Sequence, residues 1–436
     1  MQVYFDSPLP SLFSFLGLVM IYLVSLIRMP LLTSNLFKWS TRRPIDLIVT
    51  YFVFLVLFQT CWQTIFCFIS VDKGVSVIVI FILPVLYYIY FRNTLKEKEL
   101  RSIFISMAIA GLIVGAYFAY DSLSKLLFGI LPDYAVKANE YSLRRGGGNI
   151  SGYIARIDLA GRSMGLLEKH VVSSAWISIG CFAALALLPT NAKYRRILIL
   201  SIYGILLVLG MNFTGIFGFL LAIFIIEFRG YYLFRAVISR RSISAFVKYL
   251  LIFTSLLLIV SFFFGTELMK IIQKFIGIQY DIAVGTKAVY KHQLGYFGGM
   301  LSELISFPAN MFRKFPPGIL IGDGFSPGWN GTVDKGGDYG FIETLYRLGI
   351  PLFLMAFIGL FRLIRQSFKQ ITYLTITEKG NPNSIRFAAS VMIFLLFSEI
   401  HYTVWSAKPI FPVFFICLAL FSRYLPYSAR NISQGE

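Results

Sequence analysis

The sequence predicts an all-α protein that crosses a membrane about eleven times. Of its 436 residues, 57% are hydrophobic and only 14% are charged, and the mean hydropathy is +0.73. Soluble domains carry roughly 25% charged residues, so this chain lacks the polar side chains that would cover a water-soluble globule. The composition therefore excludes a soluble enzyme, a disordered chain and a disulfide-rich secreted module. Most of the chain requires a bilayer as its solvent.

About eleven apolar stretches are long enough to predict membrane-spanning helices. Crossing a hydrocarbon core of ~30 Å takes about 20 apolar residues, and a window of about 19 residues finds such stretches along most of the chain. Two stretches between 197 and 228 are short, so the count there stays open. The first 27 residues contain no Lys or Arg, unlike a signal peptide, so the first stretch is expected to remain as a membrane helix. The predicted spans are 9–27, 45–70, 75–91, 102–120, 170–188, 197–211, 213–228, 249–265, 341–361, 387–405 and 409–425.

The distribution of Lys and Arg orients these helices. With the N-terminus outside, the segments assigned to the inside contain 23 Lys and Arg, whereas the short outside segments contain 2. Cytoplasmic loops carry the excess of positive charge, while long loops cross the membrane largely regardless of charge. The sequence therefore predicts an outside N-terminus, an inside C-terminus and two long outside loops, at 121–169 and 266–340. The inside segments are 28–44, 92–101, 189–196, 229–248, 362–386 and the tail after 422.

The net charge of +19 is explained by this topology rather than by nucleic-acid binding. The most basic and aromatic inside segment, 229–248, is expected to lie on the inner-leaflet headgroups as an interfacial helix. All four cysteines fall within predicted spans, so the sequence offers no disulfide framework or thiolate metal site. We therefore expect a single polytopic domain over residues 1–436, in contact with membrane lipids and without a nucleic-acid partner.

Several common catalytic motifs are missing from the sequence. The chain has no GxxxxGK[ST] loop, HExxH pair or EF-hand pattern, and no Asp-x-Asp pair that would hold a nucleotide–metal complex. Its three histidines, His170, His292 and His401, are far apart in the sequence. We therefore expect no nucleoside triphosphate, no catalytic metal and no other cofactor. A substrate delivered through the membrane itself fits this pattern.

The first long outside loop contains a run rich in glycine and arginine, RRGGGNISGYIARIDLAGRSMG at 144–165. Its glycines allow the backbone to approach a ligand closely. Arg144, Arg145, Arg156 and Arg162 supply planar guanidinium groups, which match phosphate oxygens in bidentate fashion. The run indicates either a site for an anionic ligand or a flexible basic loop attracted to lipid headgroups.

The second long outside loop ends in a stretch rich in proline and glycine that enters a helix near Asp338. Asp338 is typical of a helix N-cap. Tyr339, Glu343 and Arg347 follow at intervals of four residues and so share one helix face. This face either binds a ligand or belongs to a capped helix, in which a Glu343–Arg347 pair lowers the cost of burying both charges.

A further group of polar residues lies near the outer end of the predicted span 387–405. Glu399, His401 and Tyr402 fall there, level with both long loops. Charged groups within membrane spans are rare and usually face a cavity or a partner. The group indicates either part of a functional site or a helix end within an aromatic belt.

The run IGDGF…GGDYGFIETLYRLGIPLFL, within residues 321–354, resembles the signature of the Wzy-type polysaccharide polymerases and the related O-antigen ligases. Two further stretches, RIDLAGRSMG and EIHYTVW, look similar to other elements of that superfamily, and the likeness covers most of the chain. One departure matters. Where many members carry Ser-Arg between a pair of spans, this chain has MNFTGIFG (Met211–Gly218), so an arginine role at that position does not transfer.

The resemblance implies a GT-C-like, metal-independent glycosyltransferase at the outer face of a bacterial inner membrane. Such an enzyme joins oligosaccharide repeat units carried on polyprenyl pyrophosphate, as in lipopolysaccharide or capsule synthesis. A chain-length regulator and a flippase are the partners that the resemblance suggests. The alternatives are an O-antigen ligase and a polysaccharide or small-molecule transporter. A transporter is expected to place its ionisable groups near the bilayer midplane and to have short outside loops.

Each candidate residue has an expected role within this resemblance. Arginines would stabilise the negative charge that develops on a lipid diphosphate leaving group. Carboxylates or a histidine would deprotonate or orient the acceptor hydroxyl, and other polar residues would contact the substrate. The clamp candidates are Arg156, Arg162 and Arg313, the catalytic candidates are Asp338, Glu343 and His401, and the substrate-binding candidates are Tyr339, Arg347 and Glu399.

Overall fold

The computed structural model is helical throughout the part of the chain that it describes, with no strand in those ranges. The described residues are 44–66, 69–93, 97–128, 170–189, 191–210, 212–227, 317–324, 340–377, 382–400, 404–405 and 410–425. The helices are α3 (Pro44–Ile65), α4 (Val71–Asn93), α5 (Glu97–Phe128), α8 (His170–Ala186), α9 (Lys193–Leu209), α10 (Phe213–Ile226), α14 (Gly318–Ile321), α15 (Gly340–Thr377), α16 (Asn383–Ser398) and α17 (Phe411–Tyr424).

Every predicted span that falls on described residues overlaps a helix, although 45–70 and 387–405 extend beyond the ends of α3 and α16. The spans 9–27 and 249–265 lie outside the described residues, as do the interfacial segment 229–248 and most of both long loops. Two short stretches near 197–228, whose count was open, form separate helices, α9 and α10, on either side of Asn212. The Asn212 side chain accepts a hydrogen bond from the Gly215 N–H and so caps α10.

Two helices continue beyond their predicted spans, because hydropathy marks apolar surface rather than the end of a helix. Helix α5 continues to Phe128, so it extends into the predicted outside loop 121–169. Helix α15 continues to Thr377, through most of the predicted inside segment 362–386. Neither extension contains Gly or Pro, and both keep a buried side, so nothing ends the helix where the apolar run ends.

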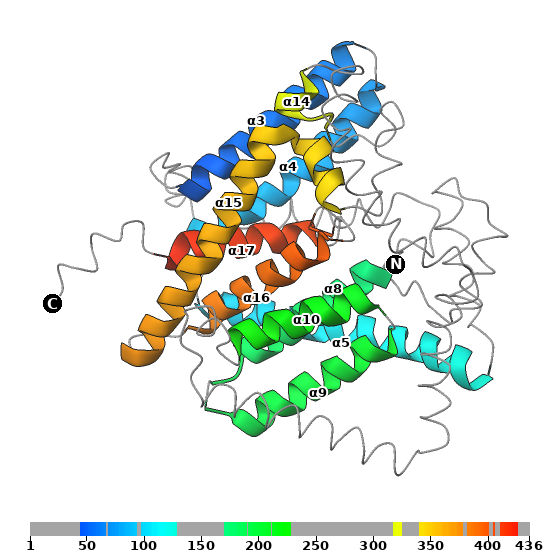
Figure 1. The fold of residues 1–436 in the computed structure, drawn as a ribbon, viewed down its shortest axis with the longest axis vertical. Coiled ribbons are helices and arrows are strands. Elements are labelled where there is room, and N and C mark those ends of the chain that lie inside the picture. The colour runs from blue at the N-terminus through cyan, green and yellow to red at the C-terminus, as the bar shows by residue number, and fades with distance from the viewer. Residues whose placement is uncertain are drawn as a thin grey trace, which may run out of the picture.

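Helix α16 lies at the centre of the bundle and packs against α8, α10, α15 and α17 (Figure 1). Nearly all of its residues are buried. Helices α5, α8, α9 and α10 lie on one side of it, and α3, α4 and the long part of α15 lie on the other. Close packing depends on small residues, as between α5 and α8, where a Cβ on Gly111 would lie 2.7 Å from the Cα of Gly180.

The outward faces of the long helices are apolar. Phe54 of α3, Ile109 of α5, Leu198 of α9 and Phe361 of α15 are each more than half exposed. Water-soluble monomers rarely expose large contiguous surfaces of this kind. Among the described helices, α3, α4, α5 and α15 are long and apolar enough to cross a membrane. The protein is therefore a membrane-embedded helical protein, as its composition predicts, while the total of eleven spans stays a prediction.

Two groups of buried charges join helix ends. Asp46, near the start of α3, pairs with Arg92, near the end of α4, at 2.7 Å. In the second group Glu227, just after α10, accepts a hydrogen bond from Arg196 of α9 and lies 4.0 Å from Arg386 of α16. All of these residues belong to ends that the charge pattern assigns to the inside. Buried ions are stable only when they are paired and hydrogen-bonded, so these contacts fix which ends lie together.

Candidate functional site

Three of the predicted site residues, Glu343, Arg347 and Glu399, lie in the described part of the chain, and they come together at one end of the bundle. Glu343 and Arg347 belong to the first turns of α15, and Glu399 immediately follows α16. These helix ends are joined by hydrogen bonds that Phe341 and Thr344 donate to Glu399. The remaining candidates, which are Arg156, Arg162, Arg313, Asp338, Tyr339 and His401, lie outside the described residues.

Helix α15 is broken at Gly349. This residue has φ 71° and ψ 168°, a conformation that only glycine adopts readily. Pro351 follows two residues later and has no N–H to donate to the Arg347 carbonyl. The break divides α15 into a short entry segment, residues 340–348, and a long helix that runs to Thr377. Figure 1 shows the sharp bend between them beside α14.

The IGDGF run packs directly on this break. Gly322 and Gly324 both have positive φ, at 74° and 89°. The Asp323 N–H between them donates to the Tyr346 carbonyl at 2.7 Å. A Cβ on Gly349 would lie only 2.6 Å from the Gly322 nitrogen, so the two backbones are in contact. The two parts of the run that resembles the polymerase signature therefore form one structural unit.

Two glutamines of α3 hold this unit in place. The Gln59 side-chain amide donates to the Arg347 carbonyl at 2.9 Å, and also to the Ile321 carbonyl. The Gln63 amide donates to the Asp323 carbonyl. The carbonyl that Pro351 leaves without a helical donor is thereby satisfied. These glutamines are not among the site residues predicted from the sequence, although two amides spaced four residues apart in an apolar span are a usable signal.

Glu343 and Arg347 form the ion pair that their spacing predicts. The Arg347 guanidinium contacts the Glu343 carboxylate, and the two side chains are 16% and 12% exposed. The other residues of the same turns, Ile342, Leu345 and Tyr346, are buried. The pair therefore lies on a less buried side of the entry segment, although both side chains are still mostly covered. Asp338, the predicted N-cap, lies before the described start of α15 at Gly340.

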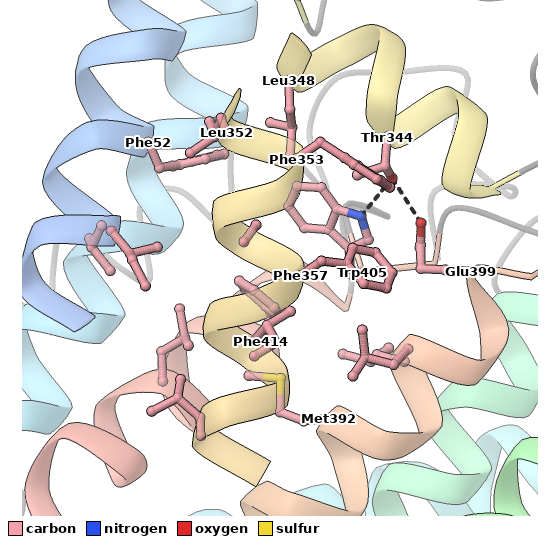
Figure 2. A pocket seen from close by; sticks show the side chains of 18 of the residues that line it. Phe52, Thr344, Leu348, Leu352, Phe353, Phe357, Met392, Glu399, Trp405 and Phe414 are labelled. Carbon is pink, nitrogen blue, oxygen red and sulfur yellow. Dashed lines mark hydrogen bonds between the residues drawn. The ribbon is translucent and has the colours of Figure 1, made fainter. Parts of the chain in front are cut away.

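Glu399 joins three elements through a buried hydrogen-bond network, shown in Figure 2. The Thr344 hydroxyl donates to Glu399 Oε2 at 2.8 Å and accepts from the Trp405 indole Nε1–H at 3.1 Å. Glu399 Oε1 accepts from the Val404 N–H at 3.2 Å. The Glu399 carbonyl accepts from the Phe341 N–H at 2.9 Å, which satisfies one of the free donors at the start of α15.

An apolar cavity of about 80 Å³ lies below this network, between α3, α15, α16 and α17. Thr344 and Glu399 border one end of it, and Figure 2 shows aromatic and aliphatic side chains along the rest of its wall. A cavity of about 150 Å³ lined by such side chains stays dry and binds a small hydrocarbon. This cavity has about half that volume, so its apolar walls enclose room for only a few carbon atoms. Its lining includes Phe52, Leu352, Phe357, Met392 and Phe414.

Comparisons with protein-family models, with curated proteins and with solved structures give no match to this chain. The functional assignment therefore depends on the residues and contacts described above.

Proposed function

We propose that this chain polymerises lipid-linked oligosaccharide repeat units at the outer face of a bacterial inner membrane. One observation carries the proposal beyond the sequence resemblance. The IGDGF run and the YRLGIP run meet in the structure, where Gly322 contacts Gly349 and the Asp323 N–H donates to the Tyr346 carbonyl. This contact supports the proposal because the resembling residues behave as one unit at the helix ends assigned to the outside.

The proposed reaction is a glycosyl transfer. An acceptor hydroxyl attacks the anomeric carbon of the lipid-linked sugar, and the bond from that carbon to the diphosphate oxygen breaks. The lipid diphosphate leaves with the bonding electron pair, and the hydroxyl proton passes to a basic residue. Glu343, paired with Arg347 on a less buried side of the entry segment, is one candidate for that role, beside Asp338 and His401. Arg156, Arg162 and Arg313 are the proposed clamp for the leaving diphosphate.

The apolar cavity adds a second line of support. A lipid-linked substrate brings a hydrocarbon chain to the site, and its sugar must remain at the outer interface. The cavity has apolar walls and reaches the Thr344–Glu399 network at the end that is assigned to the outside. Two groups of buried ion pairs lie at the helix ends assigned to the inside, on the side of the bundle opposite the proposed site. A transporter is expected to place its ionisable groups near the bilayer midplane instead, so the position of these pairs favours an enzyme.

The activity is tested with purified protein in liposomes that contain a defined lipid-linked repeat unit. A gel of the products should show a ladder of polymer lengths, and the ladder should form equally well in EDTA because the sequence contains no Asp-x-Asp pair or clustered histidines. A single transfer to a different lipid acceptor would identify a ligase. Movement of the repeat unit across the bilayer without a ladder would identify a transporter. Loss of the ladder in EDTA with recovery in magnesium or manganese would contradict the metal-independent mechanism.

The orientation of the chain is predicted from the 23-to-2 bias of Lys and Arg between the inside and short outside segments. Reporter fusions at Gly147 and Gly331 should report the outside, and fusions at Ser239 and Gly380 should report the inside. A cytoplasmic signal at Gly331 would place the proposed site on the wrong face of the membrane and overturn the proposal.

The clamp predicts that lysine cannot replace arginine at two positions. Arg156→Lys and Arg313→Lys should each lower polymer yield by about 10²–10³, nearly as much as the alanine variants, because an ammonium group does not reproduce the guanidinium fork. Polymer yields are measured at matched membrane abundance. Wild-type yields from both lysine variants would show that these arginines only attract headgroups.

A further inference from the structure

We infer that Glu399 is a positioning residue: through Thr344 it holds the entry segment so that Glu343 and Arg347 face the acceptor. This inference rests on the proposed function. The role expected for Glu399 from the sequence is substrate binding, whereas the role inferred here is to hold Thr344 and, through it, Glu343 and Arg347.

The hydrogen bonds of Glu399 are directed to the protein. One carboxylate oxygen accepts from the Thr344 hydroxyl at 2.8 Å, and the other accepts from the Val404 N–H at 3.2 Å. The residue is only 3% exposed. A carboxylate in this state is suited to fixing its neighbours, because each of its oxygens is bound to a different segment and buried hydrogen-bond networks make a structure rigid.

The entry segment is attached at both of its ends. At its start, Glu399 binds the Phe341 N–H through its carbonyl and Thr344 through its carboxylate. At its far end, Asp323 and Gln59 bind the last carbonyls before the break at Gly349. Without the Glu399 bonds, the start of the segment would lose both of its contacts with the end of α16 and keep only the Trp405 hydrogen bond and its apolar packing.

The orientation of the ion pair follows from these attachments. Thr344 lies next to Glu343 and three residues before Arg347, so a rotation of the segment that breaks the Thr344 bond also moves both charged groups. The Trp405 indole donates to the same Thr344 oxygen at 3.1 Å and resists that rotation from the other side. Thr344 is therefore the contact through which Glu399 acts.

The test compares variants that differ in a single hydrogen-bonding group. Thr344→Val removes the hydroxyl while keeping the shape of the side chain, and Thr344→Ser restores the hydroxyl. Glu399→Gln keeps the size of the side chain and loses one acceptor oxygen. Ser398→Ala is the matched control, because Ser398 is also buried and adjacent to Glu399, but its hydroxyl donates to the Phe394 carbonyl within α16.

Two quantities are measured on each purified variant. The first is amide hydrogen exchange in peptides covering residues 340–348, with a peptide from α9 as the reference. The second is the separate kcat and KM for the lipid-linked repeat unit. In Thr344→Val and Glu399→Gln we expect exchange in the entry segment to rise about tenfold while α9 is unchanged. We expect kcat to fall about tenfold to a hundredfold, with KM within about twofold of wild type. Thr344→Ser and Ser398→Ala should resemble wild type in both.

Three results would overturn the inference. A raised KM with unchanged exchange would show that Glu399 contacts the substrate directly. Faster exchange in α9 as well as in the entry segment would show that the network only stabilises the whole bundle. Unchanged exchange in Thr344→Val would show that the network does not hold the segment. If the wild-type protein makes no polymer, the proposed function fails, while the exchange measurements still decide whether Glu399 holds residues 340–348.

Discussion

Gly349→Ala is expected to detach the IGDGF run from α15 and to abolish polymer formation. The alanine Cβ would meet the Gly322 nitrogen at 2.6 Å and the Leu320 carbonyl carbon at 2.7 Å, both of which are backbone atoms. The backbone would also be held at φ 71° and ψ 168°, where a residue with a side chain is strained by about 1–3 kcal/mol. Strain and overlap together should cost about 3 kcal/mol or more, enough to open the contact. Hydrogen exchange in residues 317–324 and 340–348 measures this directly.

A matched control comes from another glycine of the bundle. Gly204 lies within α9, and a Cβ added there would meet nothing within 4 Å. Gly204→Ala should leave exchange in both segments unchanged and stabilise α9 by up to about 1 kcal/mol. Wild-type exchange and wild-type activity in Gly349→Ala would show that the break at Gly349 is not needed.

Glu227→Gln is expected to cause a large loss of stability at the other end of the bundle. Glu227 is the carboxylate beside the guanidinium groups of Arg196 and Arg386, and its side chain is only 11% exposed. The variant leaves two buried positive charges beside one another. Removing one partner of a buried ion pair typically costs about 3–5 kcal/mol. The midpoint of thermal unfolding, measured in detergent or nanodiscs, should therefore fall by several degrees.

The control for this variant is Glu97→Gln, which removes the same charge from an exposed position at the start of α5. It should change the unfolding midpoint little, because exposed ion pairs contribute about 0–1 kcal/mol. Equal midpoints for Glu227→Gln and Glu97→Gln would mean that Glu227 does not hold the ends of α9, α10 and α16 together.

The features that depend on local sequence were predictable. Apolar stretches predict the helices, and the spacing of Glu343 and Arg347 predicts their ion pair, because residues four apart lie on one helix face. Gly349 followed by Pro351 also marks a place where a helix is disfavoured, although the predicted span runs through it. The helix ends at Phe128 and Thr377 do not follow from hydropathy, because a helix continues beyond its apolar part when no residue breaks it.

The contacts between distant segments were not predictable from one sequence. Gln59 binds a carbonyl 288 residues away, and Thr344 binds a carboxylate 55 residues away. The local pattern does not predict which helix ends are neighbours, since many arrangements of the helices bury the same apolar faces. The sequence therefore indicated Glu399 as a functional residue but not that both of its carboxylate oxygens bind within the protein.

The most direct test of the central claim is the number of lipid diphosphate molecules released for each glycosidic bond formed. Purified protein in liposomes is given a repeat unit that is radiolabelled in both the sugar and the diphosphate. Polymerisation predicts one lipid diphosphate released per bond, with the growing chain still attached to a single lipid diphosphate. Repeat units that cross the bilayer or remain intact, with no lipid diphosphate released, would contradict the assignment of this protein as a polymerase.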